Sequence, residues 1–565
     1  MNINIKAQNS NTYDAIVVGT GISGGWAAKE LAEKGLKTLV LERGRDVKHV
    51  EDYPTMLKDP WELPNNDQLS AEELKLYEKQ SRTGYTVRES TKHWWVKDPN
   101  QPYREEKPFN WMRGYHVGGR SIMWGRQSYR LSPMDFEANA KDGIGVDWPI
   151  RYSDLEDWYS YVERFAGISG QAEGLPQLPD SVFQPPMELN CLEEHFKESI
   201  KNRFDRMLTI GRVANLTEPK DGRGMCMHRN LCIRGCPYGG YFSSNASTLP
   251  AAASTGNMTL RPHSIVNRVI YDENSGRATG VEVIDSETGE MIEFYSKIIF
   301  LNASTVNTTL IMLNSRSNRF PNGLGNDSGE LGHNLMDHHL SVGASGQYDG
   351  FEDKYYWGRR PNGFYIPRYR NLNANNRDYI RGFGYQGGGS RQNWVAAVRE
   401  LAIGKQLKEF VQTPGTWTLG MGGFGEMLPD HSNRLYLDFD KTDKWGQPTV
   451  VFDCELKENE LLMRKDMMED AAEMLEAAGF KNINTYDSQP PPGHGIHEMG
   501  TARMGRDPKT SVLNGWNQIH SVKNVFVTDG ACMTSSACQN PSLTYMALTA
   551  RAANYASEEL KKGNL

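Results

Sequence analysis

Residues 13–24 read YDAIVVGTGISG, an apolar run that ends in glycine and is followed closely by two more glycines. Continuous apolar runs of this length are typical of strands that are buried on both faces of a parallel sheet. From Gly25 to Lys34 the apolar residues recur at the spacing of a helix, and Gly35 is expected to end that helix. A second apolar run, Thr38 to Glu42, ends on an acid. The stretch is therefore predicted to form a complete β-α-β unit of about thirty residues.

The glycine spacing of this unit, Gly19-x-Gly21-x-x-Gly24, predicts a nucleotide site. Gly19 permits a tight turn, Gly21 lets a pyrophosphate approach the backbone, and Gly24 allows the helix to pack closely. The helix N-terminus favours phosphate, and the Glu42 carboxylate can accept hydrogen bonds from both ribose hydroxyls. A β-α-β turn that binds nothing is the alternative interpretation. Strand, glycines, helix and acid together favour an adenine dinucleotide, either FAD or NAD.

The composition excludes several classes of protein. The 565 residues include 63 basic and 70 acidic side chains, for a formal net charge of −7, with 38% hydrophobic and 24% charged residues. These values fit a globular protein and exclude a disordered or collagen-like chain. The absence of a basic excess argues against nucleic acid as a partner. No run of about 18 apolar residues predicts a transmembrane segment.

Changes in residue composition and pattern divide the chain into three parts. Residues 1–335 are predicted to hold the first pieces of a dinucleotide-binding domain, with an irregular, proline-rich insertion at about 50–110 and a cysteine loop at 222–240. Residues 336–489, rich in Gly, Tyr and Trp, fit a substrate-binding domain. Residues 490–565 return to the first domain, which is therefore discontinuous.

Alternating β-rich runs between residues 257 and 303 predict an antiparallel meander inserted between pieces of the parallel sheet. Its members are 258–261, 264–271, 278–284 and 290–295. Residues 297–303 are predicted to form another, buried strand.

Five motifs in order along the chain resemble the glucose-methanol-choline (GMC) family of flavin oxidoreductases. After the glycine unit and Glu42 come RGYHVGGRSIMWG at 113–125, LGHNLMDH at 331–338, HEMGTARMG at 497–505, and VFVTDG at 525–530 with NPSLT at 540–544. The resemblance covers most of the chain. It implies an α/β fold in which a discontinuous, Rossmann-like FAD-binding domain joins an α+β substrate-binding domain.

The same resemblance implies which residues hold FAD. In this family the Gly118-Gly119 region covers the flavin and its diphosphate, Asp529-Gly530 and the Asn-Pro-x-x-Thr element hold the ribityl chain and ring, and strand residues contact adenosine. The cofactor-binding residues implied are Gly19, Gly21, Gly24, Glu42, Arg43, Gly118, Gly119, Ser121, Trp124, Val266, Ala303, Asp529, Gly530, Asn540 and Thr544.

Two motifs supply the residues that the family places at the reactive face of the flavin, His497 and Asn540. Alcohol oxidation requires a base for the hydroxyl proton while hydride leaves for flavin N5, and histidine titrates near working pH. We therefore expect His497 to be the catalytic base and Asn540 to orient the hydroxyl. No acid spacing completes a metal site with the remaining histidines of these segments, which we expect to be loop and packing residues: His333, His338, His339 and His494.

Within the family, the sequence resembles the bacterial branch of sugar and glucoside 3-dehydrogenase catalytic subunits and pyranose oxidases. Pyranose oxidases can tether the flavin through a histidine in a Ser-Thr-His-Trp element. This chain has Met123 at that position, between Ile122 and Trp124. A thioether cannot form the tether, so the resemblance predicts noncovalent FAD.

Three of the seven cysteines, Cys226, Cys232 and Cys236, lie within eleven residues. Closely spaced thiolates are typical of iron–sulfur ligation, and three suffice for a [3Fe-4S] cluster. Membrane-linked sugar dehydrogenases of this branch have a similar loop, which passes electrons to a cytochrome. Their pattern begins with a Cys-Cys pair, whereas the second position here is Met227. A loop of free thiols, or a zinc site completed by His228, are the alternatives.

The resemblance thus implies an FAD-dependent dehydrogenase that oxidises a secondary hydroxyl of a sugar or glycoside, at C3, to a keto-sugar. A pyranose-type oxidase that uses oxygen, a flavin electron-transfer subunit without turnover, and an NAD-dependent dehydrogenase are the alternatives. The first residues, Met1 to Ser10, show no export signal. This fits either a cytoplasmic protein or co-export to the periplasm with a small signal-bearing subunit, as the resemblance implies. Cytochrome c or another electron acceptor is the further expected partner.

Overall fold

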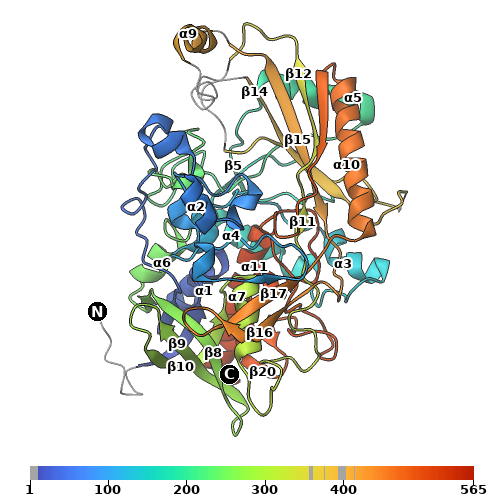
Figure 1. The fold of residues 1–565 in the computed structure, drawn as a ribbon. Coiled ribbons are helices and arrows are strands. Elements are labelled where there is room, and N and C mark those ends of the chain that lie inside the picture. Colours follow the sequence, from blue (N-terminus) through green and yellow to red (C-terminus); the bar gives the residue numbers. More distant parts are fainter. Residues whose placement is uncertain (1–10, 356–360, 375, 392–402, 413) are drawn as a thin grey trace.

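A computed structural model describes residues 11–355, 361–374, 376–391, 403–412 and 414–565 (Figure 1). Two large sheets lie at opposite ends of an elongated molecule, the first around β8, β9, β10 and β20 and the second around β12, β14 and β15. Helices pack against both sheets.

The first sheet has eight strands, and β1 lies near its centre. Its strands are β1 (Thr12–Val18), β2 (Thr38–Leu41), β7 (Met258–Arg261), β8 (Ser264–Asp272), β9 (Arg277–Asp285), β10 (Met291–Leu301), β19 (Gln518–Ile519) and β20 (Val522–Val527). Strand β1 pairs in parallel with β2 and β10, and β10 pairs in parallel with β20. Strands that are neighbours in space therefore come from opposite ends of the sequence.

Alternate residues of β1 point into two different cores, as a strand with a side-chain period of two requires. Ala15 and Val17 pack with α1 (Ile22–Glu33), α6 (Thr248–Ser254) and α11 (Ser542–Lys561). Ile16 and Val18 belong to the larger core on the other face, together with α4 (Glu156–Ala166) and part of α7 (Thr305–Asn314). Burial on both faces explains why this strand is a continuous apolar run, and it confirms the predicted β-α-β unit.

The predicted meander differs from the structure in two respects. Residues 290–295 and 297–303 were expected to be separate strands, but β10 runs unbroken from Met291 to Leu301. Its first half pairs with β9 in antiparallel fashion and its second half pairs with β1 in parallel, so one strand belongs to both arrangements. Strand β7 pairs in parallel with β2 and is therefore part of the parallel sheet. The meander consists of β8, β9 and β10.

The second sheet has the order β18-β12-β15-β14-β13-β6, with β11 also paired to β15. Its elements are β6 (Thr209–Ile210), β11 (His338–His339), β12 (Val342–Tyr348), β13 (Phe364–Ile366), β14 (Phe383–Arg391), β15 (Trp417–Glu426) and β18 (Lys481–Asp487), with α5 (Cys191–Phe204) and α10 (Glu458–Ala477) packed against them and α9 (Gly404–Gln412) nearby. All strands except β6 lie within the predicted substrate-binding range. The domain boundaries themselves remain a prediction.

The insertion at about 50–110 consists of loops and short helices, as expected from its prolines. It contains α2 (Ala71–Leu76) and β3 (Arg104–Glu105), and β3 extends a small sheet with β16 (Arg434–Thr442) and β17 (Pro448–Asp453). The remaining elements are α3 (Pro133–Asp142), β4 (Ile168–Ser169) and β5 (Phe183–Gln184).

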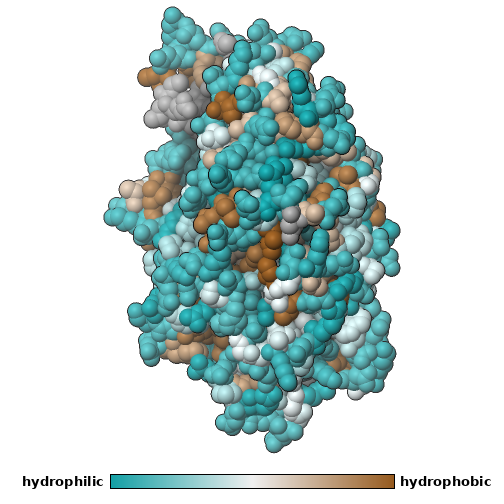
Figure 2. Space-filling view, turned by 90° about the vertical axis from the view of Figure 1, so that its right-hand side faces the viewer, coloured by the Kyte–Doolittle hydropathy of each residue, from teal (hydrophilic) through white to brown (hydrophobic). Residues whose placement is uncertain are grey.

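The surface in Figure 2 is largely hydrophilic, with hydrophobic residues in scattered groups, several of them at mid-height. None of the helices in the described ranges is long and apolar enough to span a membrane.

Candidate active site

A cavity of about 480 Å³ lies at the carboxyl ends of the parallel strands of the first sheet. Its wall includes a residue from the carboxyl end of each of four strands. Gly19, Glu42 and Asn302 directly follow β1, β2 and β10, and Asp529 comes two residues after β20. Ligands of open α/β sheets bind at this edge. The position of the cavity is therefore the one that the β-α-β unit predicts.

The three motif glycines have different local surroundings. Gly19 has φ +96°, and a Cβ there would lie 2.3 Å from the Asn302 carbonyl oxygen. A Cβ on Gly24 would lie 2.0 Å from the Gly19 carbonyl oxygen, so Gly24 allows α1 to pack against the turn. Gly21 lines the cavity, and nothing lies within 4 Å of its Cβ position. Neighbouring protein atoms thus exclude a side chain at Gly19 and at Gly24, whereas at Gly21 the space belongs to the cavity.

Glu42 is buried at the end of β2, and the adjacent turn holds its carboxylate. Oε2 accepts hydrogen bonds from Thr20 Oγ1 at 2.5 Å and from Thr20 N at 3.3 Å, and Oε1 accepts one from Gly44 N at 3.0 Å. Burial raises the pKa of this carboxyl above its ordinary value. Oε1 keeps a further lone pair for a donor such as a ribose hydroxyl.

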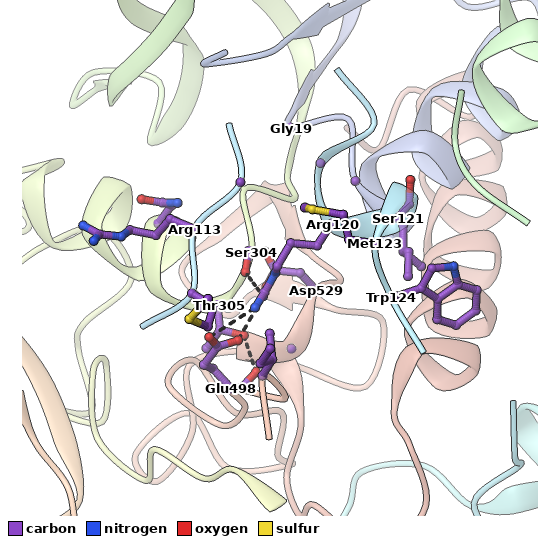
Figure 3. A pocket seen from close by; sticks show the side chains of 18 of the residues that line it. Gly19, Arg113, Arg120, Ser121, Met123, Trp124, Ser304, Thr305, Glu498 and Asp529 are labelled. Carbon is purple, nitrogen blue, oxygen red and sulfur yellow. Dashed lines mark hydrogen bonds and ion pairs between the residues drawn. The ribbon is translucent and has the colours of Figure 1, made fainter. Parts of the chain in front are cut away.

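An ion pair between the partly buried Arg120 and the buried Glu498 lies in the cavity wall (Figure 3). Arg120 Nη2 donates to Glu498 Oε2 at 2.9 Å and to Ser304 Oγ at 2.9 Å. Asp529 lies nearby, where Thr308 Oγ1 donates to it at 2.6 Å and Ala531 N at 3.0 Å. Burial raises the pKa of Asp529 to about 6.

The cavity wall fits a large polar ligand such as FAD. Five buried atoms in it have no hydrogen-bond partner among the described residues: Arg43 Nε, Arg113 Nε, Arg126 Nε, Asn302 Oδ1 and Tyr545 OH. An unpaired buried polar atom costs about 1–3 kcal/mol, so a bound ligand that supplies partners would be stabilised by them. The open space over Gly21 and the α1 N-terminus suits a pyrophosphate. The residues present therefore fit the predicted dinucleotide.

His497 and Asn540 both line this cavity. The His497 backbone N–H donates to Asp337 Oδ1 at 3.0 Å, which fixes the main chain below the ring. Burial and the neighbouring His338 and Arg120 lower the pKa of His497 well below its ordinary value. The ring is therefore neutral at neutral pH, as an acceptor for a hydroxyl proton must be.

Most of the predicted cofactor residues come together in the cavity wall. They are Gly19, Gly21, Glu42, Arg43, Gly119, Ser121, Trp124, Val266, Ala303, Asp529, Gly530 and Asn540. The three exceptions support the wall from behind. Gly24 packs against Gly19, Gly118 N donates to Thr20 Oγ1 at 2.9 Å, and Thr544 Oγ1 bonds the Tyr159 hydroxyl at 2.8 Å. Met123, at the position of the histidine tether, also lines the cavity.

The cysteine loop gives no support to the predicted cluster. Cys226, Cys232 and Cys236 are free, partly buried thiols outside the cavity lining. In the described part of the chain, no group of three or more His, Cys, Asp or Glu side chains is arranged to hold a metal ion. Burial raises the pKa of Cys226 to about 11, so this thiol is protonated at neutral pH. The residues as placed do not fit an iron–sulfur or zinc site.

Sequence reasoning missed four polar residues of the site: Arg120, His338, Gln386 and Glu498. His338 was expected to be a packing residue, but its Nδ1 lies 2.9 Å from His497 Nδ1. Gln386 Nε2 donates to Asn540 Oδ1 at 2.6 Å. Arg120, His338 and Glu498 lie inside the quoted motifs, and so a polar residue within a motif was the available signal. Gln386 lies in β14, where nothing in the sequence marks it.

Comparison with known proteins identifies the family. Family models described as GMC oxidoreductase match residues 13–340 and 429–549. The chain belongs to the GMC oxidoreductase family. GMC oxidoreductases bind FAD and act on the CH–OH groups of alcohols and sugars, and so the recognition made from the motifs is confirmed.

Two relatives match this GMC oxidoreductase over nearly their whole length. 2-Methyl-1,2-propanediol dehydrogenase of Mycolicibacterium austroafricanum is 29% identical over 97% of this chain and 96% of its own. The fructose dehydrogenase large subunit of Gluconobacter japonicus is 26% identical over 97% and 98%. Formate oxidase from Aspergillus oryzae has the same fold, with a TM-score of 0.62, 14% identity and coverage of 98% and 99%. The predicted fold class is thereby confirmed.

Proposed function

We propose that this protein is an FAD-dependent dehydrogenase that oxidises a secondary hydroxyl of a sugar or glycoside, at C3, to a keto-sugar. The observation that supports it is that His497 and Asn540 line the same cavity as the turn that suits a dinucleotide. Bound FAD would supply the acceptor for the hydride. The chain itself would bind and orient the hydroxyl and take its proton.

The roles of the two residues follow from their contacts. Gln386 Nε2 donates a hydrogen bond to Asn540 Oδ1. The amide N–H of Asn540 then remains free to donate to the substrate hydroxyl oxygen. His497, neutral at neutral pH, would accept the hydroxyl proton. One residue then positions the oxygen while the other removes its hydrogen, and the two do not compete for the proton.

A hydroxyl-rich substrate is supported by three side-chain amides in the cavity wall, Gln127, Asn362 and Gln386. One polar atom of each amide forms a hydrogen bond with another residue of the protein. Gln127 Oε1 accepts from the Tyr129 hydroxyl at 2.7 Å, Asn362 Nδ2 donates to Gly125 O at 2.8 Å, and Gln386 Nε2 donates to Asn540 Oδ1. No hydrogen bond among the described residues uses the opposite ends. They can donate to and accept from sugar hydroxyls.

The test is the anaerobic reduction of the bound flavin by a panel of glucosides and free sugars, followed by NMR of the product to locate the keto group. We expect bleaching of the flavin with glycosides and a carbonyl at C3. His497→Ala should slow the reduction by about 10²-fold or more, the usual contribution of a general base. His431→Ala, at an exposed histidine outside the cavity, is the matched control and should reduce at the wild-type rate. Equal rates in both variants would contradict the assignment of the base.

The name of the Mycolicibacterium relative supports a second candidate, a small diol. Including 1,2-diols in the same panel separates the two. Faster reduction by diols than by any glycoside would transfer the proposal to the smaller substrates.

Electron transfer to an acceptor other than oxygen, through a partner subunit to a cytochrome, completes the proposal. It is supported by the name of the Gluconobacter relative, a large subunit. Reoxidation of the reduced protein by air should be slow compared with reoxidation by a quinone or dye. Rapid reoxidation by air alone would indicate an oxidase instead.

A further inference from the structure

The ring of His338 stands edge-on to the ring of His497. The ring centroids are 5.0 Å apart, the planes meet at 88°, and the two Nδ1 atoms are 2.9 Å apart. One of these two nitrogens must therefore donate a proton and the other must accept it. Which one donates is decided by the other contact of His338.

The second nitrogen of His338 faces a carbonyl. Nε2 lies 2.9 Å from the Ala537 carbonyl oxygen, and a carbonyl oxygen can only accept, so Nε2 bears the proton. Burial lowers the pKa of His338 to about 4, and so the ring is neutral at neutral pH and has a bare Nδ1. The hydrogen bond between the rings then runs from His497 Nδ1–H to His338 Nδ1.

We propose that His338 is a positioning residue that holds His497 in the tautomer with its proton on Nδ1, leaving Nε2 bare to accept the substrate's hydroxyl proton. The catalytic consequence rests on the proposed function, whereas the tautomer itself does not. In free histidine both tautomers are populated, and the one protonated at Nε2 could not act as the base through that atom.

The two rings are held on a rigid frame. His338 lies in β11, which pairs with the Glu426 end of β15. Asp337, the residue before it, accepts the backbone N–H groups of Gly495 at 2.9 Å and of His497 at 3.0 Å. The carboxylate thus ties the His497 loop directly to the strand that positions His338. Rotation of either ring would break the hydrogen bond between the two Nδ1 atoms, and rotation of His338 would also break its bond to the Ala537 carbonyl oxygen.

The same arrangement determines where the proton stays after transfer. When the substrate O–H bond breaks and the N–H bond forms at His497 Nε2, the ring becomes an imidazolium that still donates from Nδ1 to His338. His338 is buried and already donates from Nε2 to the Ala537 carbonyl oxygen, whereas His497 lines the cavity, so we expect the positive charge to remain on His497. The other charged groups that face this pair are Asp337, Arg120 and Glu498. Bound FAD would supply the acceptor for the hydride lost from carbon.

Two substitutions separate the acceptor role from a packing role. In His338→Asn, the amide oxygen can occupy the place of Nδ1 and accept from His497, while the bond to Ala537 is lost. In His338→Gln, the terminal amide can reach the place of Nε2 and donate to Ala537, while the acceptor facing His497 is lost. If His338 had only a structural role, both substitutions would slow flavin reduction. His338→Asn, which loses the buried bond to the Ala537 carbonyl oxygen, would then slow it more.

The experiment uses the FAD-loaded, full-length protein labelled with ¹⁵N-histidine. Wild type and His338→Asn should show His497 with a protonated Nδ1 and a bare Nε2, and His338→Gln should show a mixture of tautomers. The flavin reduction rate should fall severalfold in His338→Gln, in proportion to the fraction of His497 that keeps a bare Nε2, with unchanged FAD content and substrate affinity, and should be largely retained in His338→Asn.

A His497 protonated at Nε2 in the wild type would overturn the inference, as would equal loss of rate in the two variants. If no alcohol in the panel reduces the flavin, the proposed function fails, yet the ¹⁵N spectrum still decides the tautomer. The two failures are therefore distinguishable.

Discussion

Asn540 is useful to an alcohol substrate only if its amide is turned the right way. The 2.6 Å bond from Gln386 Nε2 to Asn540 Oδ1 fixes that orientation across the boundary between the two sheets. Gln386 belongs to β14, in a glycine-rich segment that lines the cavity. A residue of the second sheet therefore determines the orientation of an amide in the loop that precedes α11.

Gln386→Leu tests this dependence. Without its partner the Asn540 amide can rotate and present its oxygen, which cannot donate to the substrate hydroxyl. We expect flavin reduction to slow by about tenfold, the effect of losing one hydrogen bond of roughly 1.4 kcal/mol, with a weaker affinity for substrate. Stopped-flow reduction at varied substrate concentration measures both quantities. Thr418→Val, in the neighbouring strand and outside the cavity lining, is a suitable control and should behave as wild type. An unchanged rate in Gln386→Leu would show that Asn540 needs no such support.

The sequence could single out His497 and Asn540 as candidate site residues because each lies in a motif of its own, and both line the cavity. It could not supply their partners. His338 is 159 residues from His497, and Gln386 is 154 residues from Asn540. Hydrogen-bond polarity arises from such distant contacts, and no local spacing encodes it.

Among the elements, the start of α1 offers the clearest test of what a glycine does. Gly21 caps the helix with φ −67° and faces the cavity, whereas Gly24 faces the protein. Substitution by alanine should therefore have different effects at the two positions.

Gly21→Ala should fold with nearly unchanged stability, because its Cβ meets no protein atom, but should bind FAD tenfold or more weakly since the methyl group occupies cofactor space. Gly24→Ala should lose about 3 kcal/mol of stability, because its Cβ would lie 2.0 Å from the Gly19 carbonyl oxygen. Thermal unfolding of the apoproteins and flavin titration measure the two effects. Loss of apoprotein stability in Gly21→Ala would contradict the assignment.

The elements that could be predicted are those whose pattern is local. The β-α-β unit is such a case, although α1 begins at Ile22 instead of Gly25. The single long strand β10 could not be predicted, because its break in pattern near Ser296 marks a change of partner and not a turn. Likewise, β6 joins the second sheet through pairing with β13, which its own two residues do not reveal.

The stability of the whole molecule should depend on the protonation of Asp337. Burial, together with the nearby Glu498, raises the pKa of this carboxyl to about 7, well above its ordinary value of 3.8. Between these two pH values the folded protein keeps a proton that the unfolded chain has released. The free energy of unfolding therefore decreases as the pH rises through this window.

Asp337→Asn removes the titration and leaves the other groups in place. The thermal midpoint of the wild-type apoprotein minus that of the variant should decrease as the pH rises from about 5 to about 8. Scanning calorimetry of both proteins at matched ionic strength measures this difference. A difference that stays constant with pH would show that Asp337 does not titrate in this range.

The sheet order has a consequence for biosynthesis. Strand β20 and helix α11 are synthesised long after β1, yet β20 pairs with β10 and α11 packs against α1. While the ribosome is still translating the middle of the chain, the apolar faces of β10 and α1 have no permanent cover. These apolar faces therefore stay exposed to solvent until the C-terminal part of the chain has been synthesised. The cavity that suits the cofactor is complete later still, because its last lining residues in the sequence are Asn540, Ser542 and Tyr545.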